Sequence, residues 1–99
     1  MIKRIVKMEL LPKNEALFIS IFEKVKRQIR NQPGCEGLEL LRSSAGDHLN
    51  IWTISLWHHE DDLNHYRSSE LFMKTWTAVK PLFSGKTEAW TLTNIDLLP

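Results

Sequence analysis

The sequence lacks several features that would restrict its function at once. It contains a single cysteine, Cys35, so no internal disulfide can form, which agrees with a reducing compartment. Its apolar stretches are only a few residues long, far below the roughly 20 residues that a membrane-spanning helix needs. No long apolar segment of the kind found in signal peptides follows Met1–Arg4. These absences predict a cytoplasmic protein that does not enter a membrane.

The chain also lacks an excess of charge of either sign. Thirteen Lys and Arg residues stand against 12 Asp and Glu residues, which gives a formal net charge of +1. Binding to a nucleic-acid backbone relies on a strong basic excess, so nucleic acid is not expected as a partner. The 99 residues are 42% hydrophobic and 25% charged. This composition predicts one globular domain over residues 1–99.

The hydrophobic pattern predicts four strands and two helical regions. Partial alternation and β-branched or aromatic residues predict strands over 2–11, 38–42, 48–57 and 86–95. Apolar residues at helical intervals predict an amphipathic helix over 16–31 and a broken helical region over 58–83. The order predicts an α+β, ferredoxin-like βαββαβ fold, an antiparallel four-stranded sheet with its helices on one face.

Several residues mark the predicted boundaries. Asn14 and Ser69 precede helical segments and are predicted N-caps, and Ser68-Ser69 interrupts the second helical region. A turn is predicted over residues 43–47. Cys35 follows Pro33-Gly34 and is predicted to lie in a turn as an unreactive thiol, because no base or cation stands beside it in the sequence.

The third predicted strand is apolar on both of its faces. One set of alternating positions includes Leu49, Ile51 and Trp57, and the other includes Trp52, Ile54 and Leu56. The helices cover only one face of the sheet, so the other face would expose a large apolar patch. Symmetric self-association is the common way to cover such a patch. The sequence therefore predicts a homodimer with two sheets packed face to face.

Three groups of residues together resemble the antibiotic biosynthesis monooxygenase (ABM) family. Residues 33–37, Pro-Gly-Cys-Glu-Gly, are similar to a turn that precedes the hairpin in that family. Residues 57–68 are similar to its Trp followed by a helix that carries a His and a Ser, and residues 80–83 with Glu88 extend the similarity. The resemblance implies a dimeric α+β barrel with a small apolar pocket between helices and sheet. Characterised members include cofactor-free oxygenases of electron-rich aromatics such as quinols, and haem-degrading enzymes.

The same resemblance implies candidate site residues. Trp57 matches the family tryptophan near the pocket and can stack on an aromatic substrate; the alternative is a core tryptophan that ties strand to helix. His65 matches the helical histidine, and an imidazole can take a proton from a quinol or phenol near neutral pH; a structural role is the alternative. Trp57 and His65 are therefore the predicted catalytic residues. The predicted substrate-binding residues are Thr53, Tyr66, Phe72 and Trp76.

No cofactor or metal is expected. The haem-degrading branch needs a helical histidine as axial ligand, where this chain has Thr75–Thr77, and an asparagine in the first strand, where it has Lys7–Glu9. The quinol-oxidising branch has an asparagine four residues before the tryptophan, where this chain has Thr53, whose hydroxyl can still bind a substrate oxygen. The histidines and acids between residues 58 and 65 match no standard zinc spacing.

The sequence therefore predicts a cofactor-independent monooxygenase that acts on a small aromatic or quinol-like substrate. The alternative is a non-catalytic dimeric protein that binds a small apolar ligand. A dimer with a filled core and no ligand is a third possibility.

Overall fold

The computed structural model describes residues 1–45 and 47–99, which form a four-stranded sheet and three helices. The elements are β1 (Ile2–Leu10), α1 (Glu15–Arg30), β2 (Cys35–Ala45), β3 (His48–Trp57), α2 (Glu60–Arg67), α3 (Glu70–Val79) and β4 (Glu88–Thr93), with 3₁₀ turns at Pro12–Asn14 and Lys80–Leu82. The strand order is β2-β3-β1-β4, and every pair is antiparallel. The predicted α+β, ferredoxin-like fold is confirmed.

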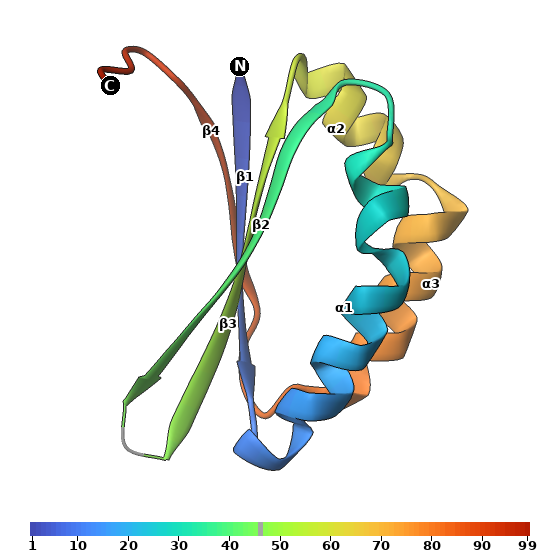
Figure 1. Cartoon of the computed structure of the whole chain (residues 1–99), viewed down its shortest axis with the longest axis vertical. Coiled ribbons are helices and arrows are strands. Elements are labelled where there is room, and N and C mark those ends of the chain that lie inside the picture. The colour runs from blue at the N-terminus through green and yellow to red at the C-terminus, as the bar shows by residue number, and fades with distance from the viewer. Residues whose placement is uncertain (46) are drawn as a thin grey trace.

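The register of the strands decides which side chains meet the helices. Val6 of β1 lies opposite Thr53 of β3 and Ala89 of β4. Alternate residues of a strand point to opposite faces, so even positions of β1 and odd positions of β3 share one face. All three helices lie on that side of the sheet (Figure 1). The other side carries no helix, and we call it the open face.

Two buried clusters hold the helices on the sheet. The larger cluster joins β1, β3, α1, α3 and the 3₁₀ turn after α3 through Met8, Leu10, Phe18, Leu49, Ile51, Val79 and Leu82. The smaller cluster joins β2, β3 and α2 through Cys35, Trp57 and Leu63. Burial of one such aliphatic or aromatic side chain contributes roughly 1.5 to 3 kcal/mol. The clusters occupy different parts of the layer between helices and sheet.

Strand β2 is longer than predicted at both ends. Ala45 still pairs with His48, so the predicted turn at 43–47 is wrong for residues 43–45, while residue 46 lies outside the described residues. Cys35 pairs with Trp57 and begins the strand, with a register shift between Cys35 and Gly37, so the predicted turn position is also wrong. These residues form strand because they pair with β3, although Gly and Ser are typical of turns.

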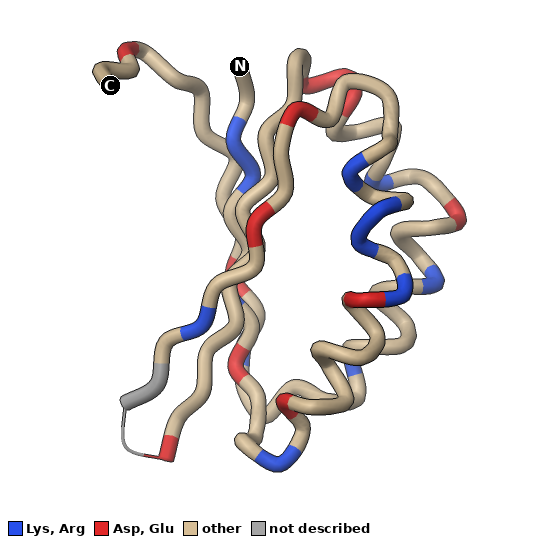
Figure 2. The backbone as a smooth tube through the Cα atoms, in the orientation of Figure 1, with Lys and Arg blue, Asp and Glu red and all other residues tan. Residues whose placement is uncertain are grey.

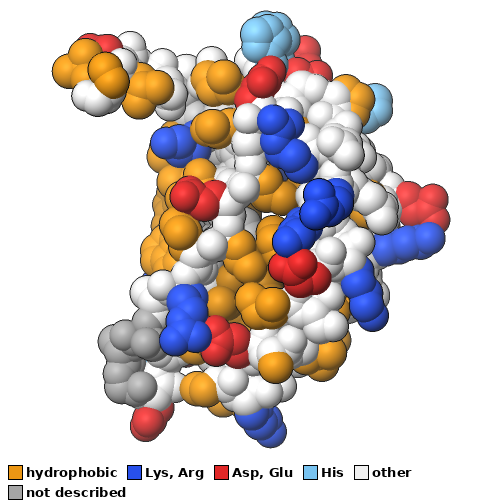
Figure 3. Space-filling view, viewed as in Figure 1, with side chains coloured by type: hydrophobic (Ala, Val, Ile, Leu, Met, Phe, Trp, Pro, Cys, Tyr) orange, Lys and Arg blue, Asp and Glu red, His pale blue; other side chains and the backbone are white. Residues whose placement is uncertain are grey.

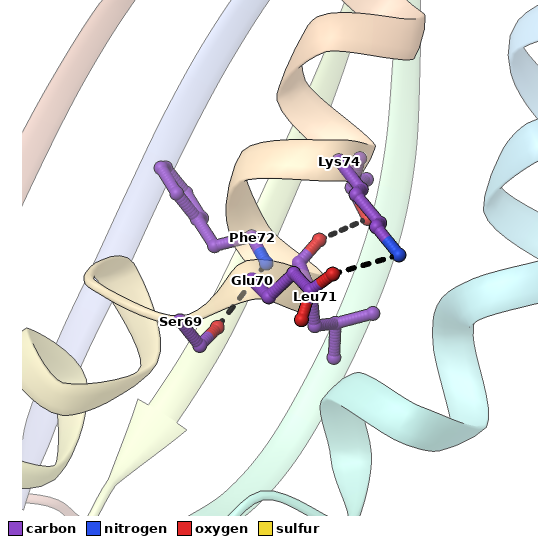
Figure 4. A network of polar contacts seen from close by, with 6 residues as sticks. Ser69, Glu70, Leu71, Phe72 and Lys74 are labelled. Atoms are coloured by element: carbon purple, nitrogen blue, oxygen red, sulfur yellow. Dashed lines mark hydrogen bonds and ion pairs between the residues drawn. The ribbon is translucent and has the colours of Figure 1, made fainter.

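The break in the second helical region is confirmed between α2 and α3. The Ser69 hydroxyl accepts a hydrogen bond from the Phe72 N–H at 3.1 Å, as predicted for an N-cap. Figure 4 shows this cap, with the Phe72 side chain pointing away from Lys74. Asn14 stands at the N-cap of α1, but its side chain makes no cap bond and donates instead to the Leu82 carbonyl at 3.2 Å.

Charged residues of both signs are interspersed along the helices and the strands (Figure 2). In the space-filling view, hydrophobic side chains gather between the strands and the helices (Figure 3). Within the described residues, no helix is both long enough and apolar enough to cross a membrane. The predicted cytoplasmic location remains a prediction.

Candidate functional site

A cavity of about 430 Å³ lies between the helices and the sheet. Strands β1 and β3 form its floor with residues such as Val6, Met8 and Thr53, and helices α1, α2 and α3 form its walls. Ala89 of the edge strand β4 and Thr87, which directly precedes β4, also line the cavity. The volume lies within the range of small-molecule binding sites, and the lining is mainly apolar and aromatic, as is usual for such sites.

All four predicted substrate-binding residues line this cavity. They are Thr53, Tyr66, Phe72 and Trp76. The three rings form a continuous series of contacts: Tyr66 meets Phe72 edge-on at 5.4 Å, and Phe72 stacks on Trp76 at 6.3 Å. The cap at Ser69 fixes the first turn of α3 and so the position of Phe72. Their roles in binding a substrate are not tested by this placement and remain predictions.

Tyr66 is the most strongly perturbed titratable residue in the cavity wall. Burial, with a smaller contribution from Cys35, raises the pKa of its phenol from 10.0 to about 12. The phenol is therefore protonated at neutral pH and can donate a hydrogen bond, but it cannot act as a base there. Burial likewise raises the pKa of the Cys35 thiol, which keeps that thiol protonated.

Trp57, a predicted catalytic residue, lies behind the cavity wall. It is fully buried, at 0% exposed, and is absent from the cavity lining. Its ring stacks on Tyr66 with centroids 5.2 Å apart, and its Nε1 donates to the Ser55 hydroxyl at 2.9 Å. Trp57 therefore holds two cavity residues in place, which is the core role that the sequence left open as the alternative.

His65, the other predicted catalytic residue, is exposed and faces away from the cavity. It lies at a separate surface depression together with Asp61, Asn64, Ser68 and Ser69. The structure thus does not bring His65 together with the four predicted binding residues. The reason is helical geometry: counted from Leu63, the cavity residues Tyr66 and Arg67 lie three and four positions on and share its face of α2, whereas His65 lies two positions on and points elsewhere.

Five polar residues of the described cavity lining were not predicted as site residues from the sequence: Arg4, Ser55, Arg67, Thr75 and Thr87. Arg4 lines the floor, Ser55 lies beside it on β3, and Arg67 ends α2 at the cavity wall. The sequence carries a signal for two of them. Arg4 shares its parity with the apolar Val6 and Met8, and Ser55 shares its parity with the buried Ile51 and Trp57, so each polar residue stands in an inward-facing row.

The lining defines what the cavity can do chemically. It can surround an apolar ring and offer the hydroxyls of Thr53 and Ser55 to a polar group. No histidine or carboxylate is among the described lining residues. In the part of the chain that the structure describes, no group of three or more His, Cys, Asp or Glu side chains could hold a metal ion.

Solved structures with the same fold cover nearly the whole chain. A Caulobacter crescentus protein proposed to be an antibiotic biosynthesis monooxygenase is 22% identical, with a TM-score of 0.86 over 96% of this chain and 90% of its own. SnoaB, a cofactor-independent oxygenase from Streptomyces nogalater, is 23% identical, with a TM-score of 0.81 over 99% and 97%. Rv0793 from Mycobacterium tuberculosis is 16% identical, with a TM-score of 0.81 over 99% and 98%.

Among curated proteins, none matches the chain significantly in sequence. The family model described as antibiotic biosynthesis monooxygenase matches residues 1–77, which is more than three quarters of the 99 residues. The chain therefore belongs to the antibiotic biosynthesis monooxygenase family.

Proposed function

We propose that the protein is a cofactor-independent monooxygenase that acts on a small aromatic or quinol-like substrate in the 430 Å³ cavity. The observation that carries this proposal is the combination of three aromatic walls, Tyr66, Phe72 and Trp76, with the hydroxyl of Thr53 on the floor. Family membership and the likeness in fold to a cofactor-independent oxygenase support the same activity.

The proposed chemistry needs little from the protein beyond binding and exclusion of water. In oxygenation without a cofactor, the electron-rich substrate anion itself reduces O₂. For an anthrone-like substrate, one oxygen atom becomes a carbonyl at the ring methylene, and the other leaves as water with the two methylene hydrogens. Thr53, Ser55 and the protonated Tyr66 supply donors for substrate oxygens. Trp57 acts as a positioning residue through Tyr66 and Ser55.

A homodimer is the proposed assembly, with the open faces packed together. Trp52 and Trp90 stack on this face with centroids 6.5 Å apart, and Ile54 and Leu56 lie on the same side of β3. Beyond β4 the C-terminal residues are strongly exposed, with Ile95 at 100% and Leu98 at 81%. A second copy would remove this apolar surface from water.

A second candidate function is the binding of a small apolar ligand without turnover. The cavity lining favours it in one respect, because the described lining residues include no histidine or carboxylate that could take a proton from a substrate. In this case the same cavity would bind a quinone-like molecule, and no oxygen would be consumed.

Oxygen uptake with 1,8-dihydroxyanthrone distinguishes the two candidates. The protein is first dialysed against a chelator and assayed without flavin or metal. The test variant is Thr75→Phe, which fills the cavity from α3, and the matched control is Thr77→Phe, two residues away on the exposed side of the same helix. Circular dichroism confirms that both variants are folded.

The monooxygenase proposal predicts uptake above the protein-free rate for the wild type and Thr77→Phe, with a loss of at least about tenfold in Thr75→Phe. Equal rates in the two variants would place the reaction outside the cavity. Binding of the anthrone without any uptake would support the second candidate.

A further inference from the structure

Two arginines lie at the same end of the cavity. Arg4 projects from β1, where it is paired with Ser55 of β3 and Thr91 of β4. Arg67 is the last residue of α2, one position after Tyr66 in the cavity wall. Both side chains line the cavity, although the two residues are 63 positions apart in the sequence. One end of an otherwise apolar site is therefore positively charged.

The described residues of the cavity lining supply no negative charge to balance this pair. No Asp or Glu is among the described lining residues, and neither arginine forms an ion pair in the described part of the chain. Arg4 donates from Nη1 to the neutral hydroxyl of Thr91 at 2.7 Å. Burial and the nearby Arg67 both lower the pKa of Arg4, yet an arginine keeps its charge in proteins. Two like charges thus face a cavity whose described lining carries no acidic group.

The two ends of the cavity differ in polarity: one end is charged and polar, and the opposite end is apolar. Arg4 and Met8 are four residues apart on β1, which places their Cα atoms roughly 13 Å from each other. Met8 belongs to the apolar cluster with Phe18 and Val79. At the other end, the Ser55 oxygen accepts from Trp57 Nε1, so its hydroxyl proton is available to a ligand beside Arg4.

We infer that the cavity takes an aromatic ligand that carries an oxyanion, with the oxyanion bound by Arg4, Arg67 and Ser55 and the ring held against Phe72 and Trp76. A guanidinium suits this task because its planar donors match the geometry of an oxyanion. The oxyanion can be a carboxylate on the ring or the phenolate of the substrate itself. In the second case the phenol proton is released to solvent water at the exposed Arg67 end of the cavity, and the two arginines stabilise the phenolate that reduces O₂.

This inference rests on one part of the proposed function, namely that the cavity is the site that binds the ligand. It does not depend on the oxygenation reaction. Its test is anaerobic isothermal titration calorimetry, in which no oxygen chemistry takes place. The probes are 2-naphthoate and 2-naphthamide, which have nearly the same shape and differ in charge at pH 7. A third probe, 2-naphthol, reports by absorbance whether a bound phenol ionises at a lower pH than it does in water.

The expected result is that the wild type binds 2-naphthoate at least about tenfold more tightly than 2-naphthamide. Arg4→Gln and Arg67→Gln should each reduce this ratio several-fold, and the double variant should bring it near one. Arg27→Gln is the matched control, because Arg27 is exposed on α1 and does not line the cavity, and it should keep the wild-type ratio. Arg67 is exposed at a helix end, so its variant is expected to fold even if Arg4→Gln does not.

Equal affinities for the two naphthalenes, no detectable binding of 2-naphthoate at millimolar concentration, or a preference that survives the double substitution would each overturn the inference. A lower ionisation midpoint of bound 2-naphthol identifies a phenolate as the bound oxyanion. An unchanged midpoint with a retained preference for 2-naphthoate identifies a carboxylate. Oxygen uptake from a neutral anthrone stays a separate measurement, so the monooxygenase proposal can fail or hold independently.

Discussion

Tyr66 connects the buried layer behind the cavity with the cavity itself. Its ring lies between Trp57 and Phe72, and its burial costs the ionised phenolate more than the neutral phenol. Since the chain contains one tyrosine, its ionisation can be followed without interference from others. This residue therefore reports directly on how well the cavity wall is packed.

Alkaline titration of Tyr66, followed by absorbance at 295 nm, should give a midpoint near 12 in the native protein and near 10 in guanidinium. Below pH 10 the Tyr66 phenol keeps its proton in both the native and the unfolded protein, so the free energy of unfolding has its full value. Between about pH 10 and 12 only the unfolded chain ionises, so stability should fall by about 2 to 3 kcal/mol in all. A midpoint near 10 while the circular dichroism is still native would contradict this burial.

His65 tests whether a family motif alone can assign a catalytic base. Its side chain is exposed and lies outside the cavity lining, so His65→Ala should leave oxygen uptake with 1,8-dihydroxyanthrone within about twofold of the wild type. Loss of a general base typically costs about 10² to 10⁴ in rate. A loss of that size, with the fold retained, would establish His65 as the base and require a conformation other than the one described.

At the scale of elements, the loop between α1 and β2 ties the strands to α2. Gly34 has a φ of 81°, in the left-handed region that favours glycine, and its carbonyl accepts from the His58 N–H at 2.8 Å. A Cβ atom at Gly34 would overlap the Asp62 side chain, whose Oδ2 accepts from the His59 N–H at 3.3 Å near the start of α2. The loop and the start of α2 therefore fit closely.

Gly34→Ala should lower the free energy of unfolding by at least about 1 to 3 kcal/mol, because it adds backbone strain to a steric overlap. Thermal unfolding followed by circular dichroism measures the change. Gly37→Ala is the control: the φ of Gly37 is not positive, and its Cβ would lie 3.3 Å from the flexible Leu56 Cδ1. Equal losses in the two variants would refute the assigned role of Gly34.

Most of the elements follow from periodicity, whereas their ends and the site depend on contacts between distant residues. The apolar rows of β3 and the Ser68-Ser69 break are local signals, and both agree with the structure. The ends of β2 are set by pairing with β3, which local turn residues do not reveal. Tyr66 and Arg67 lie three and four positions after Leu63, which places the three on one helix face, and His65 lies off that face. This part of the site follows from helical spacing in the sequence. The pairing of Arg4 with Arg67 depends on tertiary structure.

At the scale of the whole molecule, the open face should control assembly. The wild type is expected to sediment as a dimer at micromolar concentration, and Ile54→Asp should sediment as a monomer because it places a charge on the proposed interface. Leu17→Asp is the matched control, since Leu17 is 53% exposed on α1, and it should remain dimeric. A monomeric wild type would exclude packing through the open face.

The cavity between the helices and the sheet is the feature on which the proposed function depends. A crystal structure of the protein grown with 1,4-naphthoquinone, which resembles a reaction product and cannot itself be oxygenated as a quinol, shows where such a ring binds. We expect ring-shaped electron density in the cavity, in contact with Thr53 and Trp76. A cavity that holds only water, or a ring bound only at the depression beside His65, would contradict the assignment of this cavity as the substrate site.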